Sequence, residues 1–364
     1  MRLARKSLAA TLSDEISTDF CIAMNSLRSE LDLFACTAPV IISPCRPGWR
    51  CAEQGKEAPL SSRPFFRCSR WDVLPALSGV GIVALIFWTF LGFDSLSWWV
   101  LVPGFIAIIW SYCWNLQCIS HNFIHNPYFS SKLFNRAYSV LETFALGVPH
   151  VFYHHYHMNH HWGDNDKKGP EGTTRDWSSI YRYGKDDQPE NFWKYIFVSF
   201  FRVEIGPVIR VVIRHGGKEA AQALAETMVL AGFWLAMIWV NWRYFVFFYL
   251  PSYYLGWVLS YAEGYLEHYG AEPGNYFANS VSSYNWLYNF LWFNNGYHQE
   301  HHWDPKWHWT KMRLLHQQIK PQMDANHTRI LRGPHITGLL EDWWLGRRPG
   351  QTCSPANRDA VIGH

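Results

Sequence analysis

Long stretches without a charged residue dominate the middle of the chain, and they occur in two pairs. The first pair comprises residues 73–93 and 95–120, and only Asp94 separates them. The second pair comprises residues 227–242 and 244–262, with Arg243 between them. A helix needs about 20 apolar residues to cross a bilayer, and a charge at its centre costs about 2.5–3.5 kcal/mol. The pattern therefore predicts an all-α integral membrane protein with four transmembrane helices in two hairpins.

Basic residues lie on one side of the predicted spans. The turn between the first two spans has no Lys or Arg, and the second turn has only Arg243. Lys and Arg near the ends of spans favour the cytoplasmic side. We therefore expect both termini and the long loop between the two hairpins to face the cytoplasm. The basic residues that carry this expectation are Arg63, Arg67, Arg70, Lys132, Arg136, Lys167 and Lys168.

The remaining chain divides around these spans. Residues 1–66 are rich in Pro and Ser and lack a helical period, so we expect a poorly ordered N-terminal extension. Residues 67–319 form the predicted membrane domain, and residues 320–364 form a C-terminal tail. The segments 192–214 and 286–293 are apolar but too short or too interrupted by charges to span, which favours helices that lie along the membrane interface.

Composition favours a membrane protein and argues against several other classes of protein. The 21 Trp residues are typical of side chains placed at a membrane–water interface. A net charge of +3 over 364 residues is too weak to indicate a nucleic-acid-binding protein. The eight cysteines include no CxxC pair, so neither a zinc ribbon nor a secreted disulfide framework is expected.

Histidines are numerous, 18 in all, and they gather in three clusters. Within each cluster they are spaced three or four positions apart, which places their rings on one face of a helix. Their eight side chains exceed what one transition metal takes from a protein, so we expect a site for two metal ions in a cytoplasmic helical cap. The clusters are His121 with His125, His157 with His160 and His161, and His298 with His301 and His302.

The ligand type narrows the choice of metal. Imidazole nitrogen suits Fe, Cu, Zn and Ni. A structural zinc site usually includes thiolates, and none of the three clusters contains a cysteine. The HExxH signature of zinc metalloproteases is also absent from the sequence.

The ordered pattern HxxxH, HxxHH, HxxHH resembles the membrane fatty-acid desaturase and hydroxylase superfamily, which also includes carotenoid ketolases. The most specific part is residues 285–287 (NWL), followed by residues 297–302 (YHQEHH) and Pro305. The resemblance runs from about the first span to about Trp309 and makes 67–319 a desaturase-like domain. It implies a di-iron centre with O₂ as co-substrate, and it implies that His268 is an additional metal ligand.

Other histidines fall outside this pattern. His150, His154 and His155 precede the second cluster, and we expect them to lie beside the centre or on the surface without binding metal. The segment 215–217 (HGG) lacks the proline of a haem-binding loop. We expect the rest to be ordinary surface residues: His308, His316, His327, His335 and His364.

Three carboxylates adjoin the clusters, namely Glu300, Asp164 and Glu267. A carboxylate often accepts the second N–H of a metal-bound imidazole and so fixes its orientation. We hypothesise this role for all three. The sequence identifies no separate catalytic residue.

The resemblance implies desaturation of a lipid acyl chain. The alternative is hydroxylation or ketolation of a lipid or carotenoid on the same scaffold. Since the sequence contains no flavin, ferredoxin or cytochrome motif, the electrons are expected from a separate ferredoxin- or cytochrome b5-type donor. A non-catalytic membrane metal transporter is less favoured, because transporters place ionisable residues within their spans and these spans are nearly free of His, Asp and Glu.

Overall fold

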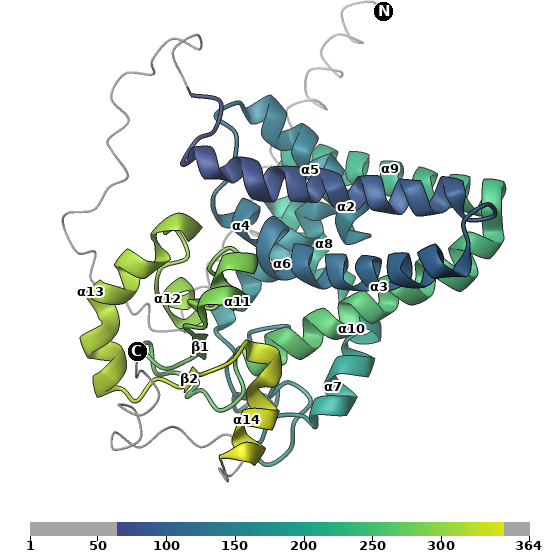
Figure 1. The fold of residues 1–364 in the computed structure, drawn as a ribbon. Helices are drawn as coiled ribbons and strands as arrows, with labels where there is room; N and C mark the ends of the chain where they lie inside the picture. The colour runs from purple at the N-terminus through teal and green to yellow at the C-terminus, as the bar shows by residue number, and fades with distance from the viewer. Residues whose placement is uncertain (1–63, 346–364) are drawn as a thin grey trace, which may run out of the picture. The chain divides into compact units, whose positions relative to one another are not determined.

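The computed structural model describes residues 64–345 and is mostly helical (Figure 1). In the first half the elements are η2 (Arg70–Asp72), α2 (Val73–Gly92), α3 (Trp98–Trp114), the π-helical η3 (Asn115–Ile119), α4 (Ser120–His125), α5 (Lys132–Leu146), α6 (His150–Gly163), α7 (Phe192–Val198), η4 (Ser199–Arg202) and α8 (Ile205–Arg214). In the second half they are α9 (Gly217–Tyr244), the π-helical η5 (Phe245–Tyr249), α10 (Leu250–Leu266), β1 (Ser282–Ser283), α11 (Trp286–Leu291), α12 (His298–Trp303), η6 (Trp309–Lys311), α13 (Met312–Ala325), β2 (Ile330–Leu331), η7 (His335–Thr337) and α14 (Gly338–Trp344).

Three helices of the described chain are long and apolar enough to cross a membrane. They comprise Arg70–Gly92, Trp98–His125 and Gly217–Leu266. The first contains α2, and α2 agrees within one residue with the apolar stretch 73–93. The second joins α3, η3 and α4, and it extends beyond the predicted end at residue 120 to include the first histidine cluster.

The third of these helices bends sharply at Asn241, where φ is −153° and ψ is 80°. Figure 1 shows α9 and α10 meeting at one end and running back from it in opposite directions, as α2 and α3 do. The bend meets the turn after α2, because the Asn241 side-chain amide donates to Asp94 at 2.8 Å and Arg243 donates to Asp94 at 2.9 Å. The Arg243–Asp94 pair is exposed, so it contributes little to stability.

Tryptophans gather around these two turns. Trp98 and Trp99 begin α3 and are 76% and 91% exposed, while Trp239 precedes the bend and is 90% exposed. An indole ring suits the boundary between hydrocarbon and water, because its body is apolar and its N–H is polar. These positions fit the interfacial role that the Trp content predicts.

The core of the helical bundle lies where α3 packs on α10. Gly256 permits this approach, because a side chain there would collide with Tyr112. Two pairs of buried hydroxyls within the bundle are bonded to each other: Tyr112 donates to Tyr249 at 3.2 Å, and Thr89 and Tyr244 share a hydrogen bond of 2.9 Å. Pairing removes the cost of burying a polar group in an apolar region.

A short parallel pair of strands ties the chain after α13 to the segment before α11. Ser282 pairs with Ile330 and Ser283 pairs with Leu331. The fully buried Arg329 donates two hydrogen bonds to Asp342, at 2.9 and 2.8 Å. Residues 328–345 therefore pack into the fold, and α13 runs across the expected boundary at residue 319.

Candidate metal centre

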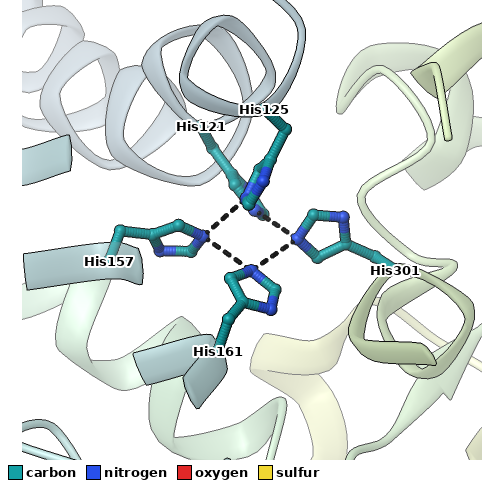
Figure 2. A group of neighbouring side chains, drawn as sticks. All are labelled: His121, His125, His157, His161 and His301. Atoms are coloured by element: carbon teal, nitrogen blue, oxygen red, sulfur yellow. Dashed lines mark hydrogen bonds between the residues drawn. The ribbon is translucent and has the colours of Figure 1, made fainter. Parts of the chain in front are cut away.

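Five histidines turn their ring nitrogens toward one another (Figure 2). Their facing nitrogens all lie within 4.8 Å of each other. Neighbouring Nε2 atoms are 2.8–2.9 Å apart around the group. The members come from α4, α6 and α12, and they are His121, His125, His157, His161 and His301.

Helical spacing explains how each element supplies its side chains. His121 and His125 are four residues apart in α4, and His157 and His161 are four apart in α6, so each pair lies on one helix face. The π-helical η3 directly precedes α4. Such a segment inserts extra backbone into a helix and is frequent at functional sites. His301 comes from α12 and completes the group.

A second group of four histidines lies beside the first. It contains His160, His268, His298 and His302, whose facing nitrogens also lie within 4.8 Å of one another. Nε2 of His268 is 3.0 Å from Nε2 of His160 and 3.3 Å from Nε2 of His298. His268 thus lies with the second and third clusters, as the resemblance implies. All nine histidines expected to bind metal fall into these two groups.

Hydrogen bonds on the outer side of the rings leave the inner nitrogens without a proton. Nδ1 of His121 donates to the carbonyl of Gln117 at 2.9 Å, and Nδ1 of His268 donates to the carbonyl of Asn279 at 3.2 Å. A neutral imidazole that donates through Nδ1 presents a lone pair at Nε2. Nε2 of His302 is buried and has no hydrogen-bond partner among the described residues. Lone pairs that converge in this way fit a metal cation between them.

Burial keeps most of these rings neutral. It lowers the pKa of His161, His301 and His298 well below the usual value, and the neighbouring histidines lower it further. A neutral imidazole is the form that binds a transition metal. The pKa shifts therefore favour metal binding at the pH of a cell.

His160 differs because a carboxylate lies behind it. Asp176 accepts a hydrogen bond from Nδ1 of His160 at 2.7 Å. Burial by itself would lower the pKa of His160, but the negative charge of Asp176 and this hydrogen bond outweigh it and raise the pKa. Asp176 was missed by the sequence analysis. It lies in the loop after α6, 15 residues beyond His161, where no spacing rule connects it to a histidine cluster.

Of the three carboxylates expected to orient ligand rings, Asp164 does so. It accepts a hydrogen bond from Nδ1 of His302 at 3.0 Å. The expectation is wrong for Glu300, which accepts hydrogen bonds from Ser282 and Tyr284 and pairs with His316 at 2.5 Å. The reason is geometric, since Glu300 projects from α12 on the side away from the two histidine groups.

Glu267 lies near the second group without a hydrogen bond to it. Its Oε1 is 3.7 Å from Nδ1 of His298 and accepts a hydrogen bond from Asn295 at 2.7 Å. With Glu263 and His335 it forms a third buried cluster, whose possible ligand atoms lie within 4.8 Å of one another. Burial raises the pKa of Glu267 well above its usual value, which favours its protonated form, and lowers that of His335 to about 4, so His335 is neutral at pH 7.

The expectation of a surface position is wrong for three histidines, which lie inside the fold. His335 is fully buried and bonds to the Val281 carbonyl, and His308 is buried and bonds to Asp72 at 2.8 Å. His316 is mostly buried beside Glu300. Segments after the third cluster fold back over the site, which local sequence does not reveal. His327 is exposed as expected, and His364 lies outside the described residues.

The histidines at the start of α6 belong to neither group. Nδ1 of His150 bonds to the Ser139 hydroxyl at 2.8 Å. His155 lies 3.3 Å from the carboxylate of Glu219. His154 also belongs to neither group, and its ring lies beside that of His155.

The donor set as a whole is nitrogen-rich and contains no thiolate. Imidazoles in groups of five and four suit two ions of a transition metal such as iron. Carboxylates hold the outer nitrogens of His160 and His302, which is a common arrangement behind metal-binding histidines. The residues present therefore fit a dimetal centre.

Curated proteins that resemble the chain act on lipids. Over 248 residues it is 26% identical to a sphingolipid delta(4)-desaturase of Schizosaccharomyces pombe, a match that covers 64% of each chain. Over 206 residues it is 25% identical to a sphingolipid delta(4)-desaturase DES1-like protein of Arabidopsis thaliana, which covers 55% of this chain and 58% of that one. The matches thus span less than two thirds of either relative.

The model of the fatty acid desaturase family matches residues 96–333, which is well over half of the chain and includes all nine histidines of the two groups. Membership agrees with the apolar helices and with the three ordered histidine clusters. The chain therefore belongs to the fatty acid desaturase family, whose members are membrane oxidoreductases of lipid metabolism.

Proposed function

We propose that this protein is an O₂-dependent desaturase that introduces a double bond into the chain of a membrane lipid at a di-iron centre. The observation that carries the proposal is the pair of adjacent histidine groups whose lone pairs converge. Iron held by nitrogen ligands with an open coordination position supplies the activation of O₂ that side chains alone do not.

The nine histidines would divide between two ions. The group around His157 would hold one ion through five nitrogens, and the group around His160 would hold the other through four. Asp164 and Asp176 would keep the outer nitrogens of His302 and His160 protonated and their rings in place. A smaller set of protein nitrogens at the second ion leaves more room for O₂ or water.

The reaction balances with two electrons from outside. Two hydrogen atoms leave adjacent carbons of the chain, and one O₂ accepts them with two electrons and two protons to give two waters. The protein's residues bind and place the chain and exclude water from the centre. Electrons would come from a separate ferredoxin- or cytochrome b5-type donor.

Sphingolipids are the proposed class of substrate, because both curated relatives are named sphingolipid desaturases. The structure agrees with a lipid substrate in general terms, since the histidine groups adjoin helices that are apolar enough for a bilayer. A chain of such a lipid would need only to slide within the membrane to reach the centre.

We also propose four membrane spans in two hairpins, with the bend at Asn241 as the second turn. The contacts from Asn241 and Arg243 to Asp94 support a common side for both turns. The helices α4, α6 and α12, which carry most of these histidines, lie away from the two turns in Figure 1, which supports a cytoplasmic position of the centre together with the basic flanking residues.

Two measurements test the function together. The purified protein is analysed for iron, and lipids of cells that express it are compared by mass spectrometry with lipids of cells that express His161→Ala. A product lighter by two hydrogens, present only with the unaltered protein and accompanied by about two irons per chain, is the expected result. A product heavier by one oxygen would support the hydroxylase alternative. Metal-free protein without any lipid product would contradict the proposal.

A further inference from the structure

A large apolar cavity lies beside α6. Its volume is about 580 Å³, within the range of about 300–1,000 Å³ that is usual for small-molecule sites. It is enclosed by the turn between α5 and α6, the segment from η4 to α8, and the facing sides of α9 and α10. Gly147 shapes the turn, because its φ of +67° and its contact with Tyr253 leave no space for a side chain.

None of the residues that line the cavity is acidic, basic or histidine. Carrying a phosphate or a carboxylate into such a site without a partner charge is strongly unfavourable. Aliphatic and aromatic side chains make up nearly the whole wall. The cavity is therefore suited to a hydrocarbon chain and unsuited to a charged headgroup.

The outer end of the cavity opens among exposed apolar residues. Phe201 is 72% exposed and Ile205 is 54% exposed, and both line the cavity. Across from them, Ala231 of α9 is also exposed. Exposed apolar side chains beside a proposed membrane helix belong in lipid rather than in water. The mouth would therefore open sideways into the bilayer.

The inner end reaches the histidine groups. Tyr153 lines the cavity, and its ring centroid lies 6.0 Å from that of His157. Its hydroxyl donates to the Leu116 carbonyl at 2.6 Å, which anchors the ring against η3. Tyr153 thus forms a wall one residue thick between the cavity and the five-histidine group.

One polar atom in the wall has no partner. The Tyr261 hydroxyl is buried and makes no hydrogen bond within the described chain, although its side chain lines the cavity. Leaving such a group unpaired is unfavourable, because it has lost its hydrogen bonds to water. A hydroxyl or amide on the occupant would satisfy it.

We infer that this cavity binds one hydrocarbon chain of an uncharged membrane lipid, which enters from the bilayer between η4–α8 and α9, and that Tyr261 hydrogen-bonds a hydroxyl or amide carried by that lipid. This inference rests on the proposed desaturase function and specifies how its substrate is held. Tyr153 limits how far the chain extends toward the centre.

Photolabelling in liposomes tests the site without requiring turnover. The probe is an N-acyl amino alcohol with a diazirine in its long chain, and labelled peptides are mapped by mass spectrometry. We expect labels within residues 147–157 and 227–234. Ala231→Trp, which fills the mouth, should lower labelling at least about fivefold, because bulk there excludes the chain. Ala236→Trp is the matched control, since Ala236 is exposed on the other side of α9 and does not line the cavity.

Equal labelling of the Ala231→Trp and Ala236→Trp variants would overturn the proposal that this cavity binds the lipid chain.

A second comparison tests the role of Tyr261. Tyr261→Phe should lower labelling by the amide probe about fivefold relative to labelling by a plain alkyl diazirine, since one hydrogen bond is lost. An unchanged ratio would overturn the role of Tyr261. Because labelling does not depend on chemistry, these results are independent of whether a desaturated product forms.

Discussion

The carboxylate of Asp176 lies 2.7 Å from Nδ1 of His160, and Asp176 is fully buried. Backbone N–H groups of Asn165 and Ser178 donate to the same carboxylate at 2.9 and 2.7 Å. Gly163 allows this loop to approach, because a side chain there would collide with the backbone of Asp176. The ring of His160 is therefore held by the loop that follows its own helix.

Asp176→Asn should weaken metal binding at the four-histidine group. The amide can still accept a hydrogen bond but carries no charge. The His160 ring is therefore oriented less firmly and is less basic. Such changes commonly cost about 10–100-fold in metal affinity or activity. Iron retained after dialysis against a chelator measures the effect. Asp186→Asn, at an exposed position in the following loop, should retain iron like the unaltered protein. Equal retention in both variants would contradict the role of Asp176.

Removal of one histidine from either group should weaken binding of the metal ion that this group holds. His301→Ala removes a member of the five-histidine group and His268→Ala a member of the four-histidine group. Each is expected to lower iron content by about half and product formation at least about a hundredfold, because the two ions act together. Metal analysis and lipid mass spectrometry on the same preparations measure both. His215→Ala, an exposed histidine outside both groups, is the control. Full activity of His268→Ala would remove that residue from the ligand set.

Labelling of introduced cysteines in intact cells tests the proposed topology. Ser95→Cys and Trp242→Cys lie at the two turns that meet through Asp94, so both should react with a membrane-impermeant maleimide added outside. Lys168→Cys should react only after the membrane is permeabilised, because basic loops favour the cytoplasm. The unsubstituted protein gives the background from its native thiols. Labelling of Lys168→Cys without permeabilisation would reverse the orientation.

Glu142 makes stability depend on pH. Burial raises the pKa of this fully buried carboxyl to about 7, and its oxygens have no hydrogen-bond partner of good geometry among the described residues. The titratable groups nearest to it are the phenols of Tyr138 and Tyr128, which burial keeps neutral by raising their pKa. Because the pKa is higher in the folded state than the ordinary 4.5, the protonated form favours folding, and stability falls as pH rises from about 4.5 through about 7.

Glu142→Gln should therefore be more stable than the unaltered protein at pH 8, by up to about 3 kcal/mol, and similar to it at pH 4.5. Thermal unfolding in detergent at several pH values measures this. Glu171→Gln, an exposed substitution, should follow the unaltered protein at every pH. An identical pH profile for Glu142→Gln and the unaltered protein would show that Glu142 does not carry the effect.

Several features were determined by local sequence. The charge-free stretches predicted an integral membrane protein and located α2 within one residue, because excluding charge from a bilayer is a requirement on each segment separately. The three histidine clusters were also visible, since ligands on one helix must be three or four residues apart. The family resemblance added His268, which no spacing rule would have selected.

Only the tertiary structure decided which histidines share a group and what lies behind them. His160 and His161 are neighbours in sequence, yet they point into different groups because successive residues of a helix are turned by about 100°. Asp176 and the buried His335 come from segments with no periodic pattern. Their positions depend on how loops and the chain after α13 pack against the bundle. Such long-range contacts cannot be predicted from the residues that are neighbours in sequence.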